Sequence, residues 1–528
     1  MEVLHGNMLP QPVRQILKTL NGSGYQAFVV GGSVRDLLLK RVPKDWDIAT
    51  NATPEEIQTL FPESFYENIF GTVGIKVPPF SKKGIEQNAT EEVIEATTFR
   101  AESHYEDNRH PSRVAFVKTI EEDLARRDFT INAMAIRLEN SLKQTEDNHH
   151  IDLVLIDPFG GQEDIRHKTL RAVGDPDTRF AEDALRMLRA IRLLSELRTP
   201  TPLSGEPFMN ERNESTKLHE GSDWHIDPET FSSLTRHAFA LRNISAERIS
   251  DELSKILLSE NPAQGIDLLR ISGLLQQIAP ELEEGVGVGQ NLHHIYTVYE
   301  HNLRALATCP SSRLEVRLAA LLHDVGKPRT KRGNGYRSTF YNHDHVGARM
   351  TRSLLTRLRF PTRIVEQATL LVDNHLFYYN VEEVTAASVR RLIKRVGLEN
   401  MRDLMHIRIA DRLGSGTPKA KPYKLRHLEY MIEKVSNDPV SVKMLAVNGH
   451  DIMKALDIRP SPKIGIILDA LLAEVIEDPE KNTVPFLLEQ ARILAKENED
   501  ALRARATEAI QEKRAEDEDK LKNRHRVS

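Results

Sequence analysis

The chain has 528 residues, with 72 lysines and arginines against 77 aspartates and glutamates, so its formal net charge is −5. At about 150 residues per domain this length predicts roughly three to four domains. The acidic balance excludes a globally basic nucleic-acid coat but not a local basic groove. The single cysteine, Cys309, excludes intrachain disulfides and cysteine-rich zinc sites, which favours a reducing cytoplasm. No apolar run approaches the roughly 20 residues of a membrane span, and the first residues lack the apolar core of a secretory signal.

The first third of the chain alternates predicted strands and helices. Residues 27–30 form a short apolar run that ends at Gly31-Gly32, which is typical of a buried strand and turn, and residues 33–40 predict a helix. Further strands are predicted at 46–49, 72–77, 93–98, 132–138 and 151–156, with polar hairpin tips at 81–92 and 139–150. From Ala181 apolar residues recur at helical spacing almost to the end. We therefore expect an α+β chain with one small mixed sheet followed by helices.

Three polar stretches interrupt this pattern. Residues 199–227 are rich in Pro, Ser, Gly and Asn, and predict a loop or linker. Residues 327–342 mix Arg, Lys and Gly. Residues 496–528 are dense in both charge signs and poor in large apolar residues, which predicts a solvated helix that frays to disorder.

Two carboxylates follow a glycine turn. The run from Gly31 to Asp36 closes a strand and opens a helix, where glycines let a phosphate approach the backbone and Arg35 adds a cation, although such a run is more often only a tight turn. In Asp45-Trp46-Asp47 the two carboxylates share one face of the predicted strand, which suits Mg²⁺ ions that activate a hydroxyl and stabilise leaving pyrophosphate. Glu95, mid-strand among apolar residues, is either a third carboxylate ligand or an edge residue paired with an arginine.

These motifs carry a family resemblance. Gly-Gly-x-Val-Arg-Asp at 31–36 followed by Asp-x-Asp at 45–47 resembles the head of the tRNA nucleotidyltransferase and bacterial poly(A) polymerase family, within the DNA polymerase β-like superfamily. The similarity continues in order through the segments 126–135, 157–161 and 179–192. It implies that Asp45 and Asp47 are catalytic and hold Mg²⁺. It also implies nucleotide contacts by Gly31, Gly32, Arg35 and Arg127, and a ribose contact by Asp128.

A charged stripe follows on the predicted helix 181–194. Asp183, Arg186, Arg189 and Arg192 recur every three residues on one side of it. A solvated face is the ordinary interpretation of such a stripe, but this one begins inside a family motif. A carboxylate only accepts and a guanidinium only donates, so Asp183 can take the amine of cytosine or adenine while Arg186 donates to the ring nitrogen. Uracil and guanine would leave both partners unpaired, so we expect selection of CTP and ATP. The resemblance implies that Arg189 and Arg192 line the same pocket.

The helical region carries a second set of metal-ligating residue types. Imidazoles and carboxylates together bind divalent metals, and here they occur as His301, His323, Asp324 and Asp411. This order resembles the HD phosphohydrolase family, and His343 and His375 fall where two-metal members carry extra histidines. The resemblance implies a divalent metal, Mg²⁺, Mn²⁺ or Ni²⁺, and 2′,3′-cyclic phosphodiesterase, 2′-nucleotidase or phosphatase activity. A module kept for packing and RNA contact is the alternative.

Together the resemblances predict five regions along the chain. They are a nucleotidyltransferase head at 1–160, an all-α neck at 161–285, an HD helical domain at 286–430, a helical tail at 431–495 and a charged end at 496–528. Residues 445–465 resemble the family's tail segment, whose expected role is either to grip the tRNA backbone through helix starts and Lys463 or to form a capping helical hairpin.

The expected function is template-independent addition of C and A to the 3′ end of tRNA. CTP and ATP would be substrates, Mg²⁺ the cofactor in the head, and the 3′ end and acceptor arm of tRNA the partner, with no membrane or protein partner implied. A poly(A) polymerase, or a partial enzyme adding only CC or only A, shares the head motifs and stays open. A further interpretation makes the HD hydrolase the main activity and the head a degenerate nucleotide sensor. The intact Asp45, Asp47, Arg127 and Asp128 argue against it.

Overall fold

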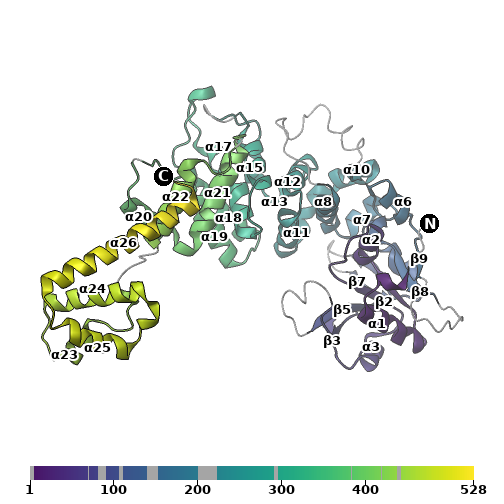
Figure 1. The fold of residues 1–528 in the computed structure, drawn as a ribbon. Coiled ribbons are helices and arrows are strands. Elements are labelled where there is room, and N and C mark those ends of the chain that lie inside the picture. Colours follow the sequence, from purple (N-terminus) through teal and green to yellow (C-terminus); the bar gives the residue numbers. More distant parts are fainter. Residues whose placement is uncertain are drawn as a thin grey trace. The chain divides into compact units, whose positions relative to one another are not determined.

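The computed structural model describes residues 5–68, 71–80, 91–105, 111–139, 153–199, 223–290, 295–377, 379–381, 383–417, 419–436 and 442–527. The chain folds into two compact units. One contains residues 1–373 and 413–416, and the other contains residues 374–412 and 417–528. The expected α+β class, with a mixed sheet followed by helices, is confirmed (Figure 1). Within the described residues, every helix is too short or too polar to cross a bilayer.

The head is built on a mixed sheet with the strand order β3-β4-β5-β2-β1-β8-β9. The strands are β1 (Ala27–Val30), β2 (Asp47–Thr50), β3 (Ser64–Asn68), β4 (Thr72–Val77), β5 (Glu92–Thr98), β8 (Ala135–Leu138) and β9 (Leu153–Ile156). Neighbouring strands are antiparallel except β2 and β5, which run parallel. All the predicted strands are found. Strand β3 was not predicted, and β2 and β8 begin later than expected.

The two faces of the sheet carry separate apolar clusters, because alternate residues of a strand point to opposite sides. Val29 and Ile48 belong to the cluster that includes buried residues of α1 (Gln11–Gly22) and α3 (Pro54–Leu60). Phe28, Val30 and Ala49 belong to the second cluster. Asp47 precedes Ile48 and therefore projects from the same face as Phe28 and Val30. This face carries the candidate site.

Shorter elements complete the head. They are η1 (Gly6–Met8), α2 (Gly32–Leu38), β6 (Arg100–Tyr105), β7 (Pro111–Phe116), α5 (Ile120–Ala125), η2 (Thr130–Asn132) and α6 (Gly161–Arg166). The antiparallel hairpin of β6 and β7 was not predicted. Most of both predicted hairpin tips, at 81–90 and 140–150, lies outside the described residues. So do residues 200–222 of the predicted loop 199–227, but its end forms β11 (His225–Ile226), which pairs in parallel with β10 (Thr169–Leu170).

The rest of the first unit is helical, as predicted. Its elements are α7 (Pro176–Glu182), α8 (Leu185–Leu197), α10 (Pro228–His237), η3 (Ala238–Asn243), α11 (Ala246–Leu258), α12 (Pro262–Ile271), α13 (Leu275–Ile278), α14 (Pro280–Glu283), α15 (Val298–Ala307), α16 (Leu314–Leu322), α17 (Lys327–Thr330), η4 (Gly335–Arg337), α18 (His343–Arg357) and α19 (Thr362–Asn374). Helix α8 is buried on most of its surface. It therefore acts as the central element between the head and the following helices.

The second unit is also helical. It contains α20 (Ala386–Val396), η5 (Leu398–Asn400), α21 (Met401–Gly414), α22 (Tyr423–Ser436), η6 (Val442–Met444), α23 (Gly449–Leu456), α24 (Pro462–Glu477), η7 (Pro479–Lys481), α25 (Val484–Leu494) and α26 (Glu499–His525). The tail segment supplies two helix starts: Asn448 and Asp451 form a capping box at α23, and Lys463 of α24 pairs with Glu499.

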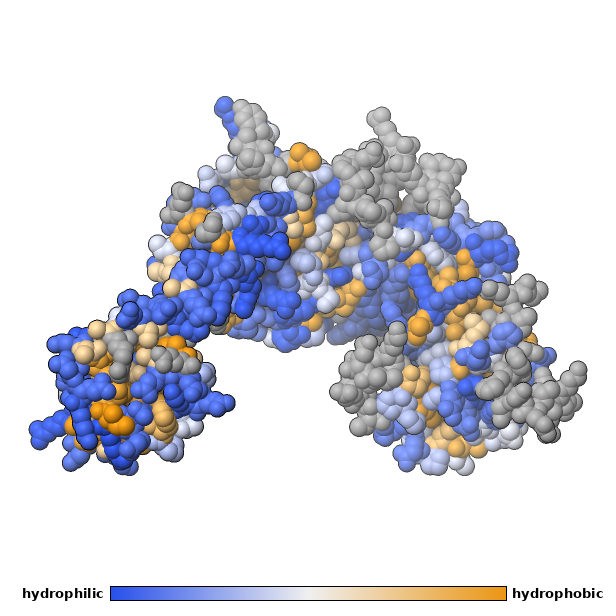
Figure 2. All heavy atoms as spheres, in the orientation of Figure 1, coloured by the Kyte–Doolittle hydropathy of each residue, from blue (hydrophilic) through white to orange (hydrophobic). Residues whose placement is uncertain are grey.

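The charged end of the chain departs from its prediction. Residues 499–525 form the single helix α26, and Leu502, Ala506 and Ile510 are buried in one apolar cluster with α24 and α25. Figure 2 shows hydrophilic residues along the C-terminal half of α26. There Glu518 accepts hydrogen bonds from Tyr430 (2.8 Å) and Lys434 (2.6 Å) of α22. The expected fraying is wrong because three widely spaced apolar residues suffice to anchor the first half, and ion pairs hold the second.

Candidate active site and metal centre

A pocket of about 570 Å³ opens beside the sheet. Its walls come from the turn after β1, from β2 and β5, from the segment after α5, and from the starts of α8 and α11. The predicted residues that line it are Gly31, Gly32, Asp47, Glu95, Arg127, Asp128, Asp183, Arg186 and Arg189. The structure therefore brings together most of the predicted head residues. Arg35, Asp45 and Arg192 are not among the lining residues.

Asp47 and Glu95 lie side by side. The parallel pairing of β2 with β5 places the two residues in register, so both side chains project from one face. Burial raises the pKa of Asp47, Arg127 opposes this shift, and the charge of Asp45 adds to it. A divalent cation relieves the repulsion between adjacent carboxylates, so this donor set fits the predicted metal. Because β5 lies between β4 and β2, the interpretation of Glu95 as an edge residue is wrong.

Asp45 lies outside the strand. It occupies an exposed bend, whereas Trp46 is buried as expected. The prediction that Asp45 and Asp47 share a strand face is therefore wrong: Val30, the last residue of β1, pairs with Asp47, and the ladder goes no further. Asp45 still acts on Asp47 through its charge. The carboxylates on the sheet are thus Asp47 and Glu95, and Asp45 approaches from the preceding loop.

Gly31 makes the close turn that the sequence predicted. Its φ is 76°, a left-handed value that favours glycine. A Cβ atom there would lie 2.8 Å from Nη1 of Arg127 and 3.6 Å from Oδ2 of Asp47. Glycine is therefore needed both for the backbone conformation and for the approach of these two functional groups.

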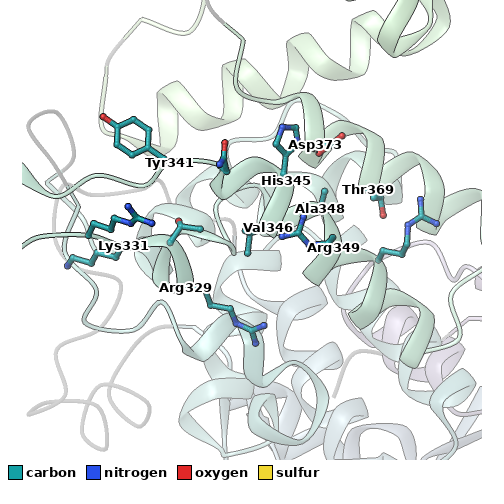
Figure 3. Close-up of a pocket in the computed structure, with 13 residues that line it drawn as sticks. Arg329, Lys331, Tyr341, His345, Val346, Ala348, Arg349, Thr369 and Asp373 are labelled. Atoms are coloured by element: carbon teal, nitrogen blue, oxygen red, sulfur yellow. Dashed lines mark hydrogen bonds and ion pairs between the residues drawn. The ribbon is translucent and has the colours of Figure 1, made fainter.

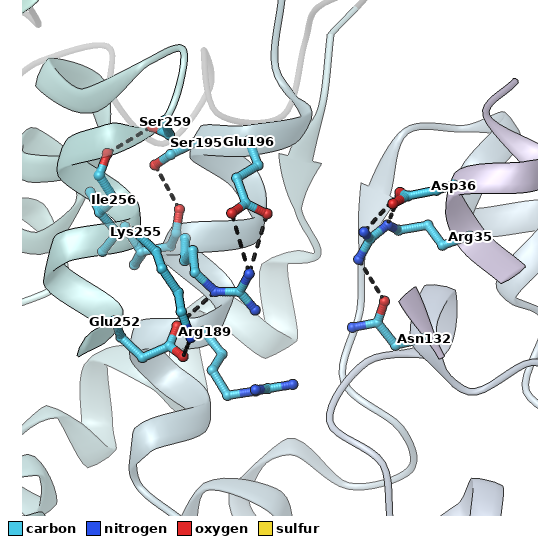
Figure 4. A network of polar contacts seen from close by, with 12 residues as sticks. Arg35, Asp36, Asn132, Arg189, Ser195, Glu196, Glu252, Lys255, Ile256 and Ser259 are labelled. Atoms are coloured by element: carbon cyan, nitrogen blue, oxygen red, sulfur yellow. Dashed lines mark hydrogen bonds and ion pairs between the residues drawn. The ribbon is translucent and has the colours of Figure 1, made fainter. Parts of the chain in front are cut away.

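Arg35 is engaged beside the pocket rather than in its wall. Its Nε and Nη2 donate to Oδ1 of Asp36 (2.9 and 2.8 Å), and its Nη1 donates to Oδ1 of Asn132 (2.9 Å; Figure 4). Asn132 in turn donates through Nδ2 to Oδ1 of Asp128 (3.2 Å). Arg35 thus braces the segment that carries Asp128, and its contact with a nucleotide stays a prediction.

One buried carboxylate holds the two arginines of the segment after α5. Oδ1 of Asp123 accepts from Nη2 of Arg126 (2.9 Å), and Oδ2 accepts from Nη2 of Arg127 (3.3 Å). Burial would raise the pKa of Asp123, but the two guanidinium groups outweigh it and lower the pKa. Asp123 therefore fixes the direction of Arg127 toward the pocket.

A buried ion pair joins the head to α8. Asp128 accepts from Nε of Arg189 (2.7 Å), from Nη2 of Arg189 (2.6 Å) and from the backbone N–H of Phe129 (2.8 Å). Burial would raise the pKa of Asp128, but the guanidinium of Arg189 holds it well below its usual range. The predicted ribose contact of Asp128 is untested, and this pairing sets its orientation.

The single helix predicted at 181–194 is wrong. Helix α7 ends at Glu182 and α8 begins at Leu185, with Asp183 in an extended conformation between them. The carboxylate of Asp183 accepts from the N–H of Leu185 (3.1 Å), which competes with a continuous helical ladder. It also accepts from Nη1 (3.2 Å) and Nη2 (2.7 Å) of Arg248 on α11. Asp183 therefore reaches the pocket from a helix break.

The other arginines of the predicted stripe have different surroundings. Arg186 is 8% exposed, lines the pocket and donates to Glu182 (2.5 Å). Arg192 donates through Nε to Glu252 (2.7 Å) and through Nη1 to Glu196 (3.2 Å), the two acidic residues labelled in Figure 4. Arg192 thus ties α8 to α11, and its place in the nucleotide pocket stays a prediction.

Three residues of the predicted HD centre meet in the first unit. Nε2 of His301 lies 2.9 Å from Nε2 of His323 and 3.2 Å from Oδ2 of Asp324. All three side chains are buried, and their ligand atoms lie within 4.8 Å of one another. Imidazole and carboxylate donors at this spacing fit a divalent metal.

In His323 and His343, the contact made by Nδ1 determines whether Nε2 can bind a metal. Nδ1 of His323 lies 2.8 Å from the carbonyl of Ala320, and Nδ1 of His343 lies 2.7 Å from the carbonyl of Phe340. An Nδ1–H that donates to a carbonyl leaves Nε2 as an acceptor, the form in which histidine binds metals. Nε2 of His343 lies 3.3 Å from Oδ1 of Asp324, so a cation there satisfies both groups.

Lys327 already supplies one positive charge to this cluster. Its Nζ lies 2.5 Å from Oδ2 of Asp324 and donates to Oε1 of Gln290 (2.7 Å). Burial would raise the pKa of Asp324, but Lys327 and His323 hold it well below its usual range. His375 and Asp411 belong to the second unit, where Arg408 donates to Asp411 (2.8 Å), and their part in the metal centre stays a prediction.

The sequence argument gave no role to several residues that organise these sites. They are Asp123, Asn132, Arg248, Gln290 and Lys327. Asp123 precedes Arg126 and Arg127 by three and four residues, a helical spacing that carries a usable signal. Arg248 follows Asp183 by 65 residues, and no local pattern indicates that pairing.

Family models match the parts of the chain that hold the pocket and the histidine–aspartate cluster. Residues 27–171 match the model of the "Poly A polymerase head domain", and residues 268–415 match the "HD domain". Residues 223–285 match the "Probable RNA and SrmB- binding site of polymerase A", and residues 343–491 match tRNA nucleotidyltransferase domain 2. The matches follow the order expected for a head, a neck and an HD-containing body.

Relatives extend the match along the chain. A CCA-adding enzyme of Geobacillus thermodenitrificans is 29% identical over 483 residues, which are 90% of this chain and 96% of that enzyme. The crystal structure of the Bacillus stearothermophilus CCA-adding enzyme in complex with CTP has a TM-score of 0.53 and 26% identity, covering 92% of this chain and 99% of that one. The chain is therefore similar to CCA-adding enzymes over most of its length.

Sequence identity to CCA-adding enzymes is higher over shorter alignments. A CCA-adding enzyme of Levilactobacillus brevis is 41% identical over 264 residues, which are 50% of this chain and 54% of that enzyme. In such alignments the chain spans about half the length of the curated relatives it matches. The similarity to a poly(A) polymerase head at 27–171 and to an HD domain at 268–415 agrees with the order of the head motifs and of the HD residues that follow them.

Proposed function

We propose that the chain adds C and A to the 3′ end of tRNA without a nucleic-acid template, using CTP and ATP. The observation that carries this proposal is the pocket in which paired carboxylates face arginines and the Asp183 break. The similar enzymes are named CCA-adding enzymes, and one is described in complex with CTP. A tRNA substrate would make the cytoplasm the place of action.

Each wall of the pocket has a chemical task in this proposal. Asp47 and Glu95, with Asp45 nearby, would hold Mg²⁺. When bound, the metal would help to activate the 3′-hydroxyl and to stabilise leaving pyrophosphate. Arg127, aimed by Asp123, would bind the triphosphate, whose oxygens match a guanidinium fork. The turn at Gly31, which carries no side chain, would let the phosphates approach the backbone.

Base selection would fall to Asp183 and Arg186. Oδ1 of Asp183 already accepts from Leu185 and Arg248, while Oδ2 accepts from Arg248 alone. A carboxylate has about four acceptor positions, so Oδ2 can take the exocyclic amine of cytosine or adenine. Arg186 would donate to the adjacent ring nitrogen. Uracil and guanine would leave buried partners unpaired.

We expect Asp183→Ala to reduce discrimination against UTP and GTP by roughly tenfold to a hundredfold, while incorporation of CTP falls much less. The measurement is incorporation of each of the four labelled nucleotides at equal concentration. Asp175→Ala is a matched control, because Asp175, like Asp183, accepts from backbone N–H at a helix start but does not line the pocket. Full discrimination against UTP and GTP in Asp183→Ala would reject a selecting role for this carboxylate.

One assay tests the proposed function as a whole. The protein is incubated with tRNA that lacks its terminal CCA, and labelled CTP and ATP are supplied singly and together. ATP incorporation that depends on CTP and stops after C, C and A supports the proposal. Long ATP tails would instead favour a poly(A) polymerase, and incorporation of CTP alone or ATP alone would favour a partial CC- or A-adding enzyme.

A second candidate activity rests on the buried cluster of His301, His323 and Asp324. We propose that it holds Mg²⁺, Mn²⁺ or Ni²⁺ and hydrolyses a phosphate ester, as the resemblance to HD phosphohydrolases implies. The carbonyl contact of His323 fixes its metal-binding tautomer, and Lys327 stabilises the charge of Asp324. The tRNA end, with its 2′ and 3′ oxygens, would be a fitting source of such an ester.

We expect His323→Ala to lower bound divalent metal from about one ion per chain to a small fraction of that, because two neighbouring ligands hold a metal far less tightly than three. Metal is measured by elemental analysis after mild purification and readdition of each ion. His345→Ala is the control, since His345 is exposed and pairs with Asp373 rather than with the cluster. Equal metal content in both variants would place the metal elsewhere.

A further inference from the structure

A second pocket, larger than the nucleotide pocket, lies on the HD part of the first unit. Its volume is about 950 Å³. We call it the basic groove, and its lining residues are Arg329, Thr330, Lys331, Arg332, Tyr341, Asn342, His345, Val346, Ala348, Arg349, Arg352, Thr369 and Asp373. Figure 3 shows Arg329 and Lys331 on one side of it and His345 and Arg349 on α18. Neither the nucleotide site nor the predicted metal ligands account for it.

The lining is strongly cationic. It includes four arginines and one lysine, and Asp373, its single carboxylate, is paired with His345 at 2.7 Å. Arg329 is paired with Glu284, and Lys331 donates to the carbonyl of Gly289. The groove therefore carries an excess of positive charge although the whole chain is acidic.

Among the described residues, three of these guanidinium groups have no hydrogen-bond or ion-pair partner. They are the exposed side chains of Arg332, Arg349 and Arg352, which all line the groove. Arg349 and Arg352 are three residues apart on α18, so they project from one helix face. Tyr341 lines the same groove and is 74% exposed. Free guanidinium forks beside an exposed aromatic ring are the elements by which proteins hold phosphates and unstacked bases.

We propose that the basic groove binds the phosphodiester backbone of an RNA strand, with a base stacked on Tyr341. The cations are spread over α17, the segment before α18 and α18 itself, which suits successive phosphates better than a single one. Lys327 and His343, at the starts of the same two helices, both contact Asp324 of the HD cluster. An RNA strand in the groove thus lies beside the predicted hydrolase centre. This inference deepens the proposed function and rests on it for tRNA as the RNA.

The test measures binding without nucleotides, so it does not depend on catalysis. The affinity of the full chain for tRNA lacking CCA is measured by fluorescence anisotropy at several salt concentrations. We expect Arg349→Ala/Arg352→Ala to weaken binding about tenfold and to reduce the slope of log K against log salt by about 1.5, since each lost phosphate contact removes about 0.7 to 0.9. Tyr341→Ala should weaken binding at least about fivefold, and Tyr341→Phe should restore it.

Lys394→Ala/Arg395→Ala is the matched control, because it removes two exposed positive charges of α20 outside the groove. We expect it to change affinity less than about twofold. An unchanged affinity in the groove variant, or an equal loss in the control, would overturn the proposal. Competition by AMP or inorganic phosphate as strong as that by RNA would assign the groove to small anions instead. If wild type binds tRNA through the groove but adds no nucleotide, only the proposed nucleotidyl transfer fails.

Discussion

Asp47→Asn should reduce nucleotide incorporation by at least about a thousandfold, which corresponds to about 4 kcal/mol of transition-state stabilisation. Asp47 is the carboxylate that the sheet holds in register with Glu95 inside the pocket. Asparagine keeps the shape of the side chain but removes the charge that a divalent ion requires. The measurement is single-turnover incorporation of labelled CTP into tRNA lacking CCA. Alanine at both Asp45 and Asp47 should have an effect at least as large.

The same substitution should leave the head as stable as before, or more so. Because burial raises the pKa of Asp47, its ionised form is disfavoured in the folded chain. The cost is present at neutral pH, where the carboxylate is charged, and disappears as the pH falls and Asp47 takes up a proton. Thermal unfolding in EDTA should therefore show an equal or higher midpoint for Asp47→Asn at pH 7, with the gain shrinking toward acidic pH.

Asp157→Asn is the control for a general effect of losing a carboxylate in the head. Asp157 accepts from the N–H groups of Gly161 and Gln162 and does not line the pocket. An asparagine oxygen can still accept one of these two bonds. Because Asp157 lies outside the pocket, this variant should retain activity within about threefold. If Asp47→Asn kept more than a tenth of wild-type activity, Asp47 would not have the catalytic role proposed for it.

Gly31→Ala should reduce incorporation by about a hundredfold, since displacing catalytic groups by about 1 Å can cost that much. The new methyl group would meet Nη1 of Arg127 at 2.8 Å and lie beside Asp47. The side chain or the turn must therefore shift, and either movement disturbs the groups that face the triphosphate. The backbone at Gly31, with φ 76° and ψ −137°, also disfavours any residue with a Cβ.

Gly160→Ala separates these causes. Gly160 also has a positive φ, 74°, but a Cβ there meets nothing within 4 Å. It should lower the free energy of unfolding by about 1 kcal/mol and leave incorporation nearly unchanged. Incorporation and thermal unfolding are measured for both variants. If both variants lost activity equally, backbone strain alone would explain the effect of Gly31→Ala. The contact with Arg127 would then not matter for activity.

Local pattern predicted much of the head. The apolar run at 27–30, the glycines that end it and the strands at 72–77 and 93–98 were all found, because burial and turn chemistry act over a few residues. Strand β3 and the hairpin of β6 and β7 were missed. They mix polar and apolar residues, and their stability comes from pairing with neighbours rather than from their own composition.

The order of the motifs also predicted which side chains line the nucleotide pocket. Asp47, Arg127, Asp128, Asp183 and Arg186 all line one pocket. The helix predicted across Asp183 was wrong, because periodicity cannot reveal that a carboxylate will accept from the backbone ahead of it. The charged end was likewise interpreted as solvated, although its few apolar residues bury against α24 and α25.

The sequence by itself determined the class of chemistry, since residue types and their spacing specify which groups can bind phosphate, base and metal. Only the tertiary structure decided how those groups meet. Parallel pairing of β2 with β5 sets Glu95 beside Asp47, and the packing of α11 on α8 brings Arg248 to Asp183. The groove with its exposed arginines likewise emerges only once α17 and α18 are in place. Such contacts join residues tens of positions apart, and their energy comes from packing and charge in three dimensions, which no local pattern encodes.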